Sequence, residues 1–192
     1  MIEIQQITKK YNDMIVFEKY NLKLQKGKTT TIIGKSGCGK TTLLRLLMGL
    51  ETVDSGKING IDNLNISAVF QEDRLIDSLS IYKNICLPHM NKDKLPSREK
   101  VQQIVNSLHV NADIKKKTGE LSGGMKRRVA IIRAMLAEFD MLILDEPFKG
   151  LDDETKYITM NFVKEYAKGN TVVLVTHDKK EIQFFDSCVI EL

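Results

Sequence analysis

The chain has few cysteines and no long hydrophobic run, and both absences narrow the class of protein. Its three cysteines (Cys38, Cys86 and Cys188) are odd in number and widely spaced, so the sequence suggests neither a disulfide framework nor a zinc site. This cysteine usage fits a reducing, cytosolic compartment. No apolar run approaches the roughly 20 residues that a membrane-spanning helix needs, so we expect any membrane role to depend on a partner.

The sequence also lacks a strong charge of one sign. A net charge of +4 over 192 residues is mild, and the basic residues are scattered, densest at residues 115–117 and 126–128. A dedicated nucleic-acid binder usually shows a longer basic stripe, so no nucleic-acid partner is expected. The chain starts in an alternating strand pattern without a signal peptide. Its length suits a single domain, residues 1–192, with no internal repeats.

The most informative segment is glycine-rich. Residues 34–42 have the sequence GKSGCGKTT and fit G-x-x-x-x-G-K-[ST], the pattern of a phosphate-binding loop, between a β-branched run (29–33) and a helix-forming run (43–48). Glycines let backbone N–H groups turn toward an anion, and the helix N-terminus adds a positive dipole. We therefore expect this loop to bind a nucleoside triphosphate, with Lys40 at the β- and γ-phosphates and the Thr41 hydroxyl on Mg²⁺. The residues of this predicted site are Gly34, Lys35, Ser36, Gly37, Cys38, Gly39, Lys40, Thr41 and Thr42.

The rest of the chain alternates between strand and helix patterns. A hairpin is predicted for residues 3–24, and buried strands are predicted at residues 66–70, 141–144, 171–176 and near 189. Helices are predicted at residues 122–138 and 153–168, and a short helix is predicted from Lys179. Between residues 72 and 120 strand signals disappear and a helical pattern runs from 96 to 108, which indicates a small helical insertion. Buried strands that alternate with helices imply a parallel sheet with helices on both faces.

Two carboxylates, Asp145 and Glu146, directly follow the apolar strand pattern at residues 141–144. Asp145 fits the residue that holds Mg²⁺ in P-loop enzymes, directly or through water. Glu146 points differently from its neighbour, so it can polarise an attacking water as a general base. Many buried strands end in acids, but the combination with the phosphate-binding loop makes the pair a strong indication of nucleotide hydrolysis.

Four further landmarks follow in one order: Gln71 after a strand, Leu-Ser-Gly-Gly at 121–124, Asp152 after Gly-Leu, and His177 after a strand. With the loop and the two carboxylates, they resemble the ATPase subunit of ATP-binding-cassette (ABC) transporters over nearly the whole chain. The Leu-Ser-Gly-Gly signature is the specific part, because it separates ABC ATPases from other P-loop enzymes. Residues 69–75 (VFQEDRL) are most similar in appearance to the ATPases of bacterial nitrate, sulfonate or taurine importers.

The resemblance implies an α/β P-loop NTPase with a parallel core sheet, an N-terminal antiparallel β subdomain and a small helical subdomain, at about residues 72–135. It implies ATP and Mg²⁺ as ligands, and a homodimer that closes head to tail around two ATP molecules. The implied partners are integral membrane permease subunits, with an extracytoplasmic solute-binding protein as a further option. The chain would then lie in the cytoplasm, on the inner face of the cell membrane.

The same resemblance assigns roles to single residues. Tyr11 would stack on adenine, although a hairpin tyrosine can also simply pack on its sheet. Gln71 would sense Mg²⁺ and the attacking water, Asp152 would touch the partner subunit, and His177 would contact the γ-phosphate. The residues assigned to the ATP of the opposite subunit are Ser122, Gly123 and Gly124. Those assigned to catalysis are Glu146, His177, Lys40 and Gln71, and those assigned to the metal are Thr41, Gln71 and Asp145.

Two positions depart from the family pattern. Met125 follows the signature where glutamine is usual, and Lys149 stands where a small residue is common. Three other functions stay open: a non-transport ABC ATPase that acts on ribosomes or DNA, a P-loop kinase or GTPase, and a module that binds ATP without turnover. A guanine-specific Asn-Lys-x-Asp motif is missing from the sequence, which weakens the GTPase alternative. Because little sequence follows His177, we expect a minimal ATPase.

Overall fold

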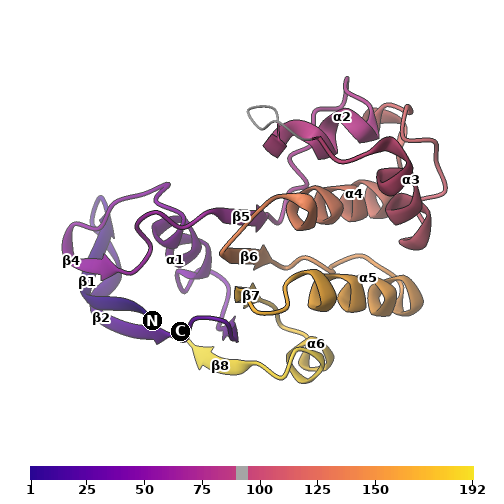
Figure 1. Ribbon diagram of the computed structural model, residues 1–192. Coiled ribbons are helices and arrows are strands. Elements are labelled where there is room, and N and C mark those ends of the chain that lie inside the picture. The colour runs from indigo at the N-terminus through magenta and orange to yellow at the C-terminus, as the bar shows by residue number, and fades with distance from the viewer. Residues whose placement is uncertain (90–94) are drawn as a thin grey trace. The chain divides into compact units, whose positions relative to one another are not determined.

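The computed structural model describes residues 1–89 and 95–192 (Figure 1). The chain divides into two compact units. The first unit comprises Met1–Ile66, Phe139–Asp145 and Gly169–Leu192. The second comprises Ser67–Glu138 and Glu146–Lys168. The boundaries expected from the sequence, one domain with a helical subdomain at about 72–135, stay a prediction, and residues 90–94 of that subdomain lie outside the described residues.

An antiparallel sheet begins the first unit. Its strands are β1 (Ile2–Tyr11), β2 (Met14–Leu24) and β4 (Ser55–Asn59), in the order β2-β1-β4. The predicted hairpin is therefore confirmed, and the short extended piece that follows the first helix adds a third strand to it. Ile2, Ile4 and Ile7 of β1 are fully or almost fully buried, because one face of an antiparallel sheet commonly packs against a core.

A parallel sheet and two helices follow in the first unit. The strands are β3 (Thr29–Ile33), β6 (Met141–Asp145), β7 (Thr171–Val175) and β8 (Cys188–Glu191), and they pair in the order β6-β7-β3-β8. Every residue of β6 and β7 is buried, as their continuous apolar sequences predict. The helices of this unit are α1 (Lys40–Leu47) and α6 (Lys179–Phe184).

The second unit is mainly helical. After the strand β5 (Ile66–Val69), which begins at the boundary between the units, it contains α2 (Ile81–Cys86), α3 (Arg98–Ser107), α4 (Gly123–Leu136) and α5 (Asp153–Tyr166), with short 3₁₀ turns at Leu87–His89 and Thr118–Glu120. The helix α2 is an element that the sequence pattern did not single out. Ser80, Ser97 and Ser122 cap α2, α3 and α4 through their hydroxyls, which satisfies backbone N–H groups at each helix start.

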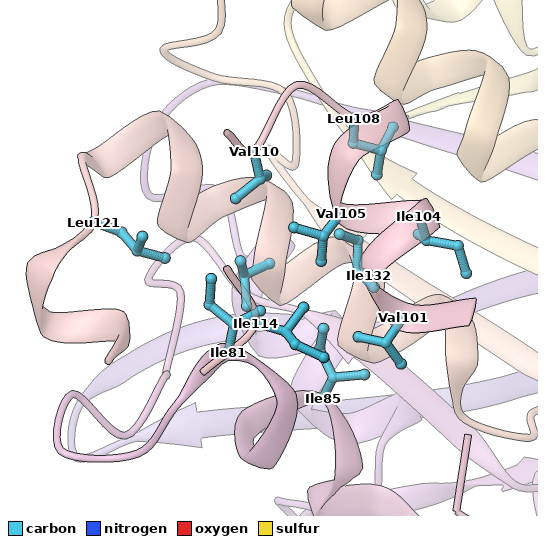
Figure 2. Packing of buried hydrophobic residues seen from close by; sticks show 11 residues of the cluster. Ile81, Ile85, Val101, Ile104, Val105, Leu108, Val110, Ile114, Leu121 and Ile132 are labelled. Atoms are coloured by element: carbon cyan, nitrogen blue, oxygen red, sulfur yellow. The ribbon is translucent and has the colours of Figure 1, made fainter. Parts of the chain in front are cut away.

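A cluster of aliphatic side chains holds this helical unit together (Figure 2). The cluster consists of Ile81, Ile85, Val101, Ile104, Val105, Leu108, Val110, Ile114, Leu121, Val129 and Ile132. Its members come from α2, α3, α4 and the segments between them, so the insertion predicted from the sequence has an apolar core of its own. Among the described residues, no helix combines the length and the apolar character that crossing a membrane requires.

Candidate active site

Three neighbouring strands of the parallel sheet deliver the predicted residues of the first unit. The register places Ile32 of β3 beside Val175 of β7, and Val175 beside Asp145 of β6. Gly34, where the phosphate-binding loop begins, follows Ile32 by two residues, and His177 follows Val175 by two. Because parallel strands end at a common edge, the loop, Asp145 and His177 emerge at the same edge, where α/β proteins generally bind ligands.

The glycines of the loop are required by backbone geometry. Gly34 has φ +153°, and a Cβ there would lie 2.7 Å from the sulfur of Cys38 and 2.8 Å from a carbonyl oxygen at Leu192. Gly39, which precedes α1, has φ +104°, and a Cβ there would lie 2.7 Å from a methyl group of Val16. Side chains at either position would therefore collide with their neighbours as well as strain the backbone.

Lys40 places a positive charge inside this loop. It is the first residue of α1, and its ammonium donates hydrogen bonds to the carbonyl oxygens of Gly34 at 2.7 Å and Lys35 at 2.8 Å. The loop thus combines an ammonium group with the N-terminus of an eight-residue helix. Both favour a bound phosphate.

Asp145 is the carboxylate that suits a magnesium ion at this edge. It is 7% exposed and ends β6. Magnesium is usually held by one or two carboxylates, water and substrate phosphates, so a single buried acid at the same strand edge as a phosphate-binding loop fits it. Within residues 1–89 and 95–192, no cluster of three or more His, Cys, Asp or Glu side chains gathers into an alternative metal site.

Tyr11, at the end of β1, is engaged by charged neighbours. Its hydroxyl donates to a carboxylate oxygen of Glu51, and the ammonium of Lys9 lies 4.9 Å from the centre of its ring. Glu51 also pairs with Lys9 at 3.3 Å and with Arg45 at 3.2 Å. Partial burial, followed by the bond to Glu51, raises the pKa of Tyr11, and that bond lowers the pKa of Glu51. The sequence alone did not point to Glu51 as the partner of this tyrosine.

The other predicted residues belong to the second unit. Glu146 adopts a left-handed backbone conformation with φ +46°, and its side chain is 20% exposed. Its carboxylate accepts a hydrogen bond from the ammonium of Lys149 at 2.7 Å. Asp152 caps α5 by accepting a hydrogen bond from the backbone N–H of Thr155, and this bond lowers its pKa.

The signature residues form the start of α4, a helix of 14 residues. The Ser122 hydroxyl accepts from the backbone N–H of Met125 at 3.4 Å. A Cβ at Gly123 would meet no atom within 4 Å, so this helix start presents an uncrowded backbone. Met125 packs against the aliphatic cluster of the helical unit, which gives an apolar role to the residue that departs from the family pattern.

Comparison with known proteins gives one consistent family. A family model described as ABC transporter matches residues 17–149. A spermidine/putrescine import ATP-binding protein PotA from Acetivibrio thermocellus is 36% identical over 99% of this chain and 58% of its own length. An uncharacterized ABC transporter ATP-binding protein from Haemophilus influenzae is 35% identical over 94% of this chain and 77% of its own length. The chain thus spans a little over half the length of the PotA relative that it matches.

Solved structures agree with this family. The dimeric, post-hydrolysis structure of the ATP-binding cassette MJ0796 with ADP and Pi superposes with a TM-score of 0.85 and is 28% identical, covering 100% of this chain and 94% of that one. This likeness confirms the predicted fold class. The narrower similarity to nitrate, sulfonate or taurine importers and the roles of the individual site residues stay predictions.

Proposed function

The chain belongs to the ABC transporter family, and we propose that it is an ATP-hydrolysing subunit that powers solute movement across a membrane through a separate permease. The observation that carries the proposal is the shared strand edge of the first unit, where the phosphate-binding loop, Asp145 and His177 emerge together. The names of the relatives, which describe ATP-binding proteins of importers or ABC transporters, support the link to transport. Import is therefore the proposed direction.

In the proposed site, the first unit binds the triphosphate. The backbone of residues 34–42 surrounds the phosphates, and the Lys40 ammonium neutralises the β- and γ-phosphates. The residues proposed to hold Mg²⁺ are Thr41, Gln71 and Asp145. When bound, the ion stabilises negative charge that develops on the transferred phosphoryl group.

Hydrolysis is proposed to use Glu146 as the general base. Its carboxylate accepts a proton from water while the water oxygen forms a bond to the γ-phosphorus, and the bond to the oxygen that bridges the β- and γ-phosphates breaks. The products are ADP and inorganic phosphate. Lys40 and the imidazole of His177 stabilise the charge on the γ-phosphate oxygens in the transition state.

A second copy of the chain is proposed to complete each site. The start of α4 in the second copy, with Ser122, Gly123 and Gly124, supplies a hydroxyl and open backbone N–H groups to the γ-phosphate. Asp152 would lie in the segment that touches the other copy. The dimeric state of the related cassette structure supports this assembly. ATP binding would close the dimer and hydrolysis would open it, which makes a two-state switch.

The proposed partners are integral membrane permease subunits, with an extracytoplasmic solute-binding protein as a further component on the other side of the membrane. The chain would then lie on the cytoplasmic face. The first alternative, a non-transport ABC ATPase, shares the ATP chemistry but acts on a soluble macromolecule. Capture of the tagged chain from detergent-solubilised membranes separates the two: a multi-span membrane protein supports the transporter, and only ribosomal or nucleoid proteins support the alternative.

The hydrolytic role is tested with Glu146→Gln. We expect this variant to bind ATP like the parent chain and to hydrolyse it at least about a hundredfold more slowly, because a general base contributes on that order or more. Glu18→Gln, on the exposed side of β2, is the matched control and keeps the parent rate. Parent-like hydrolysis by Glu146→Gln would remove Glu146 from the mechanism.

A further inference from the structure

An arginine on the signature helix holds the backbone of the segment that contains Gln71. The guanidinium of Arg127, on α4, donates to the carbonyl oxygen of Phe70 at 2.6 Å and to the carbonyl oxygen of Gln71. Its third nitrogen, Nε, lies 3.2 Å from a carboxylate oxygen of Asp73. All of these residues belong to the second unit, and Arg127 is 8% exposed.

A second arginine of α4 holds the next residues of the same segment. Arg133 donates to the carbonyl oxygen of Arg74 at 2.8 Å and to the carbonyl oxygen of Asp73 at 3.1 Å. The guanidinium of Arg74 in turn lies 3.6 Å from the centre of the Phe70 ring. Residues 70–74 are therefore attached to α4 through two guanidinium groups, while Gln71 itself stays exposed.

Arg127 contacts two carbonyl oxygens and one carboxylate at once, which makes the residue hard to replace. A planar guanidinium can serve two carbonyl oxygens and one carboxylate together, whereas an ammonium group acts as a single point charge. Burial raises the pKa of Asp73, and the charge of Arg127 is the largest influence that opposes this rise. Removing Arg127 would thus leave two carbonyl groups without their donor and a half-buried carboxylate without the cation that influences it most.

We propose that Arg127 is a positioning residue that fixes the backbone of Gln71 to the signature helix, so that the Gln71 segment and the Ser122 end of α4 move as one piece. The proposal rests on the proposed role of Gln71 in hydrolysis. A displacement of the segment around Gln71 would reach the signature serine through this contact, since both are attached to the same helix. Conversely, ATP bound at the signature would restrict the segment around Gln71.

Kinetics of Arg127→Ala, alone and combined with Gln71→Ala, test this role. We expect Arg127→Ala to lower kcat for ATP hydrolysis at least about tenfold, because a misplacement of about an ångström at a catalytic group can cost up to about a hundredfold, and to change KM for ATP less than about twofold. In the Gln71→Ala background the same substitution should lower kcat no further. Arg127→Lys, which keeps the positive charge but lacks the planar guanidinium, should give an intermediate rate of ATP hydrolysis.

The matched control is Lys126→Ala, which removes the neighbouring cation of the same helix. Lys126 pairs with Asp77, whose side chain is 65% exposed, at 2.8 Å, so we expect a change of less than about twofold. Losses that multiply in the double variant would show that Arg127 does not act through Gln71, and would overturn the proposal.

Backbone nitrogen-15 relaxation provides a readout that needs no ATPase activity. The order parameters of residues 70–74 should fall below about 0.6 in Arg127→Ala and stay higher in the parent chain and in Lys126→Ala, because the released segment gains motion. Unchanged order parameters in this segment would overturn the proposal even if the parent chain hydrolyses ATP. Conversely, a parent chain without ATPase activity would contradict the proposed function, while lower order parameters in Arg127→Ala would still support the attachment of the segment to α4.

Discussion

The ammonium of Lys149 lies 2.7 Å from a carboxylate oxygen of Glu146, three residues earlier in the chain. The Lys149 side chain is 64% exposed and that of Glu146 is 20% exposed, so water screens this ion pair. A small residue is common at the position of Lys149 in ABC ATPases. In this chain the lysine gives Glu146, the proposed general base, a positively charged neighbour. Lys149 lies in the segment between Glu146 and Asp152, and its ammonium orients the Glu146 carboxylate.

Replacing Lys149 by alanine should change the ATPase rate only modestly. Exposed ion pairs are typically worth about 0.2–1 kcal/mol, so we expect kcat to change less than about fivefold at low salt. The difference should shrink at high ionic strength, which already weakens the pair. Lys149→Arg, which keeps a cation, is the control, and steady-state kinetics at two salt concentrations are the measurement. A hundredfold loss would instead make Lys149 part of the catalytic machinery.

Gly39→Ala should destabilise the chain more than Gly49→Ala, although both glycines flank α1 with positive φ, +104° and +66°. A Cβ at Gly39 would lie 2.7 Å from Val16 and 2.9 Å from Phe17, whereas a Cβ at Gly49 would meet nothing within 4 Å. We expect a loss of about 2–4 kcal/mol in the free energy of unfolding for Gly39→Ala and about 1 kcal/mol for Gly49→Ala. Denaturant unfolding measures both, and equal losses would contradict the crowding argument.

The hydrogen bond with which Asp152 caps α5 should make the free energy of unfolding depend on pH under acidic conditions. The hydrogen bond from Thr155 holds the pKa of Asp152 below its ordinary value of 3.8, so its contribution is complete above that value and is lost as the pH falls through the lower, folded-state pKa. Asp152→Asn keeps an acceptor oxygen but cannot titrate. We expect the stability advantage of the parent over Asp152→Asn to decrease below about pH 4 in unfolding experiments. A stability difference between the two chains that stays constant down to strongly acidic pH would show that the charge of Asp152 does not contribute to the cap.

Two substitutions at Tyr11 separate its ring from its hydroxyl. If the ring stacks on adenine, Tyr11→Ala should weaken ATP binding by about five- to a hundredfold, because base–aromatic stacking is worth about 1–3 kcal/mol. Tyr11→Phe keeps the ring but loses the hydroxyl with its bonds to Glu51 and Thr42, and it should bind ATP almost as well as the parent chain. Equilibrium titration with ATP measures both affinities. Parent-like affinity in Tyr11→Ala would favour the alternative, a tyrosine that only packs on its sheet.

Local sequence patterns were sufficient to predict much of the fold and the site residues that belong to the first unit. The run at 29–33, the glycine-rich loop and the helix after it follow one another directly in the chain, so their geometry depends mainly on local backbone preferences. The strands β6 and β7 were predictable for a similar reason, since a short, continuous apolar run next to helices is typical of a buried parallel strand. The two carboxylates, Asp145 at the end of β6 and Glu146 directly after it, could be predicted because they follow that apolar run.

Side-chain partners far apart in sequence were not predictable. Glu51 meets Tyr11 across 40 residues, and Arg127 meets Gln71 across 56. Neither pairing has a period or a motif, because each depends on how two separate segments pack. The helix α2 was also missed, since its six residues are too few to show a clear helical period.

The sequence by itself determined the phosphate-binding loop, the order of its landmarks and the membership of a family, because these depend on residue types at fixed spacings along the chain. The tertiary structure decided which strands are neighbours, so that Asp145 and His177 end at the same edge as the loop. It also decided that Arg127, a residue without a motif, holds the Gln71 segment. Contacts of this kind form only when packing brings distant segments within hydrogen-bond distance, which no local preference encodes.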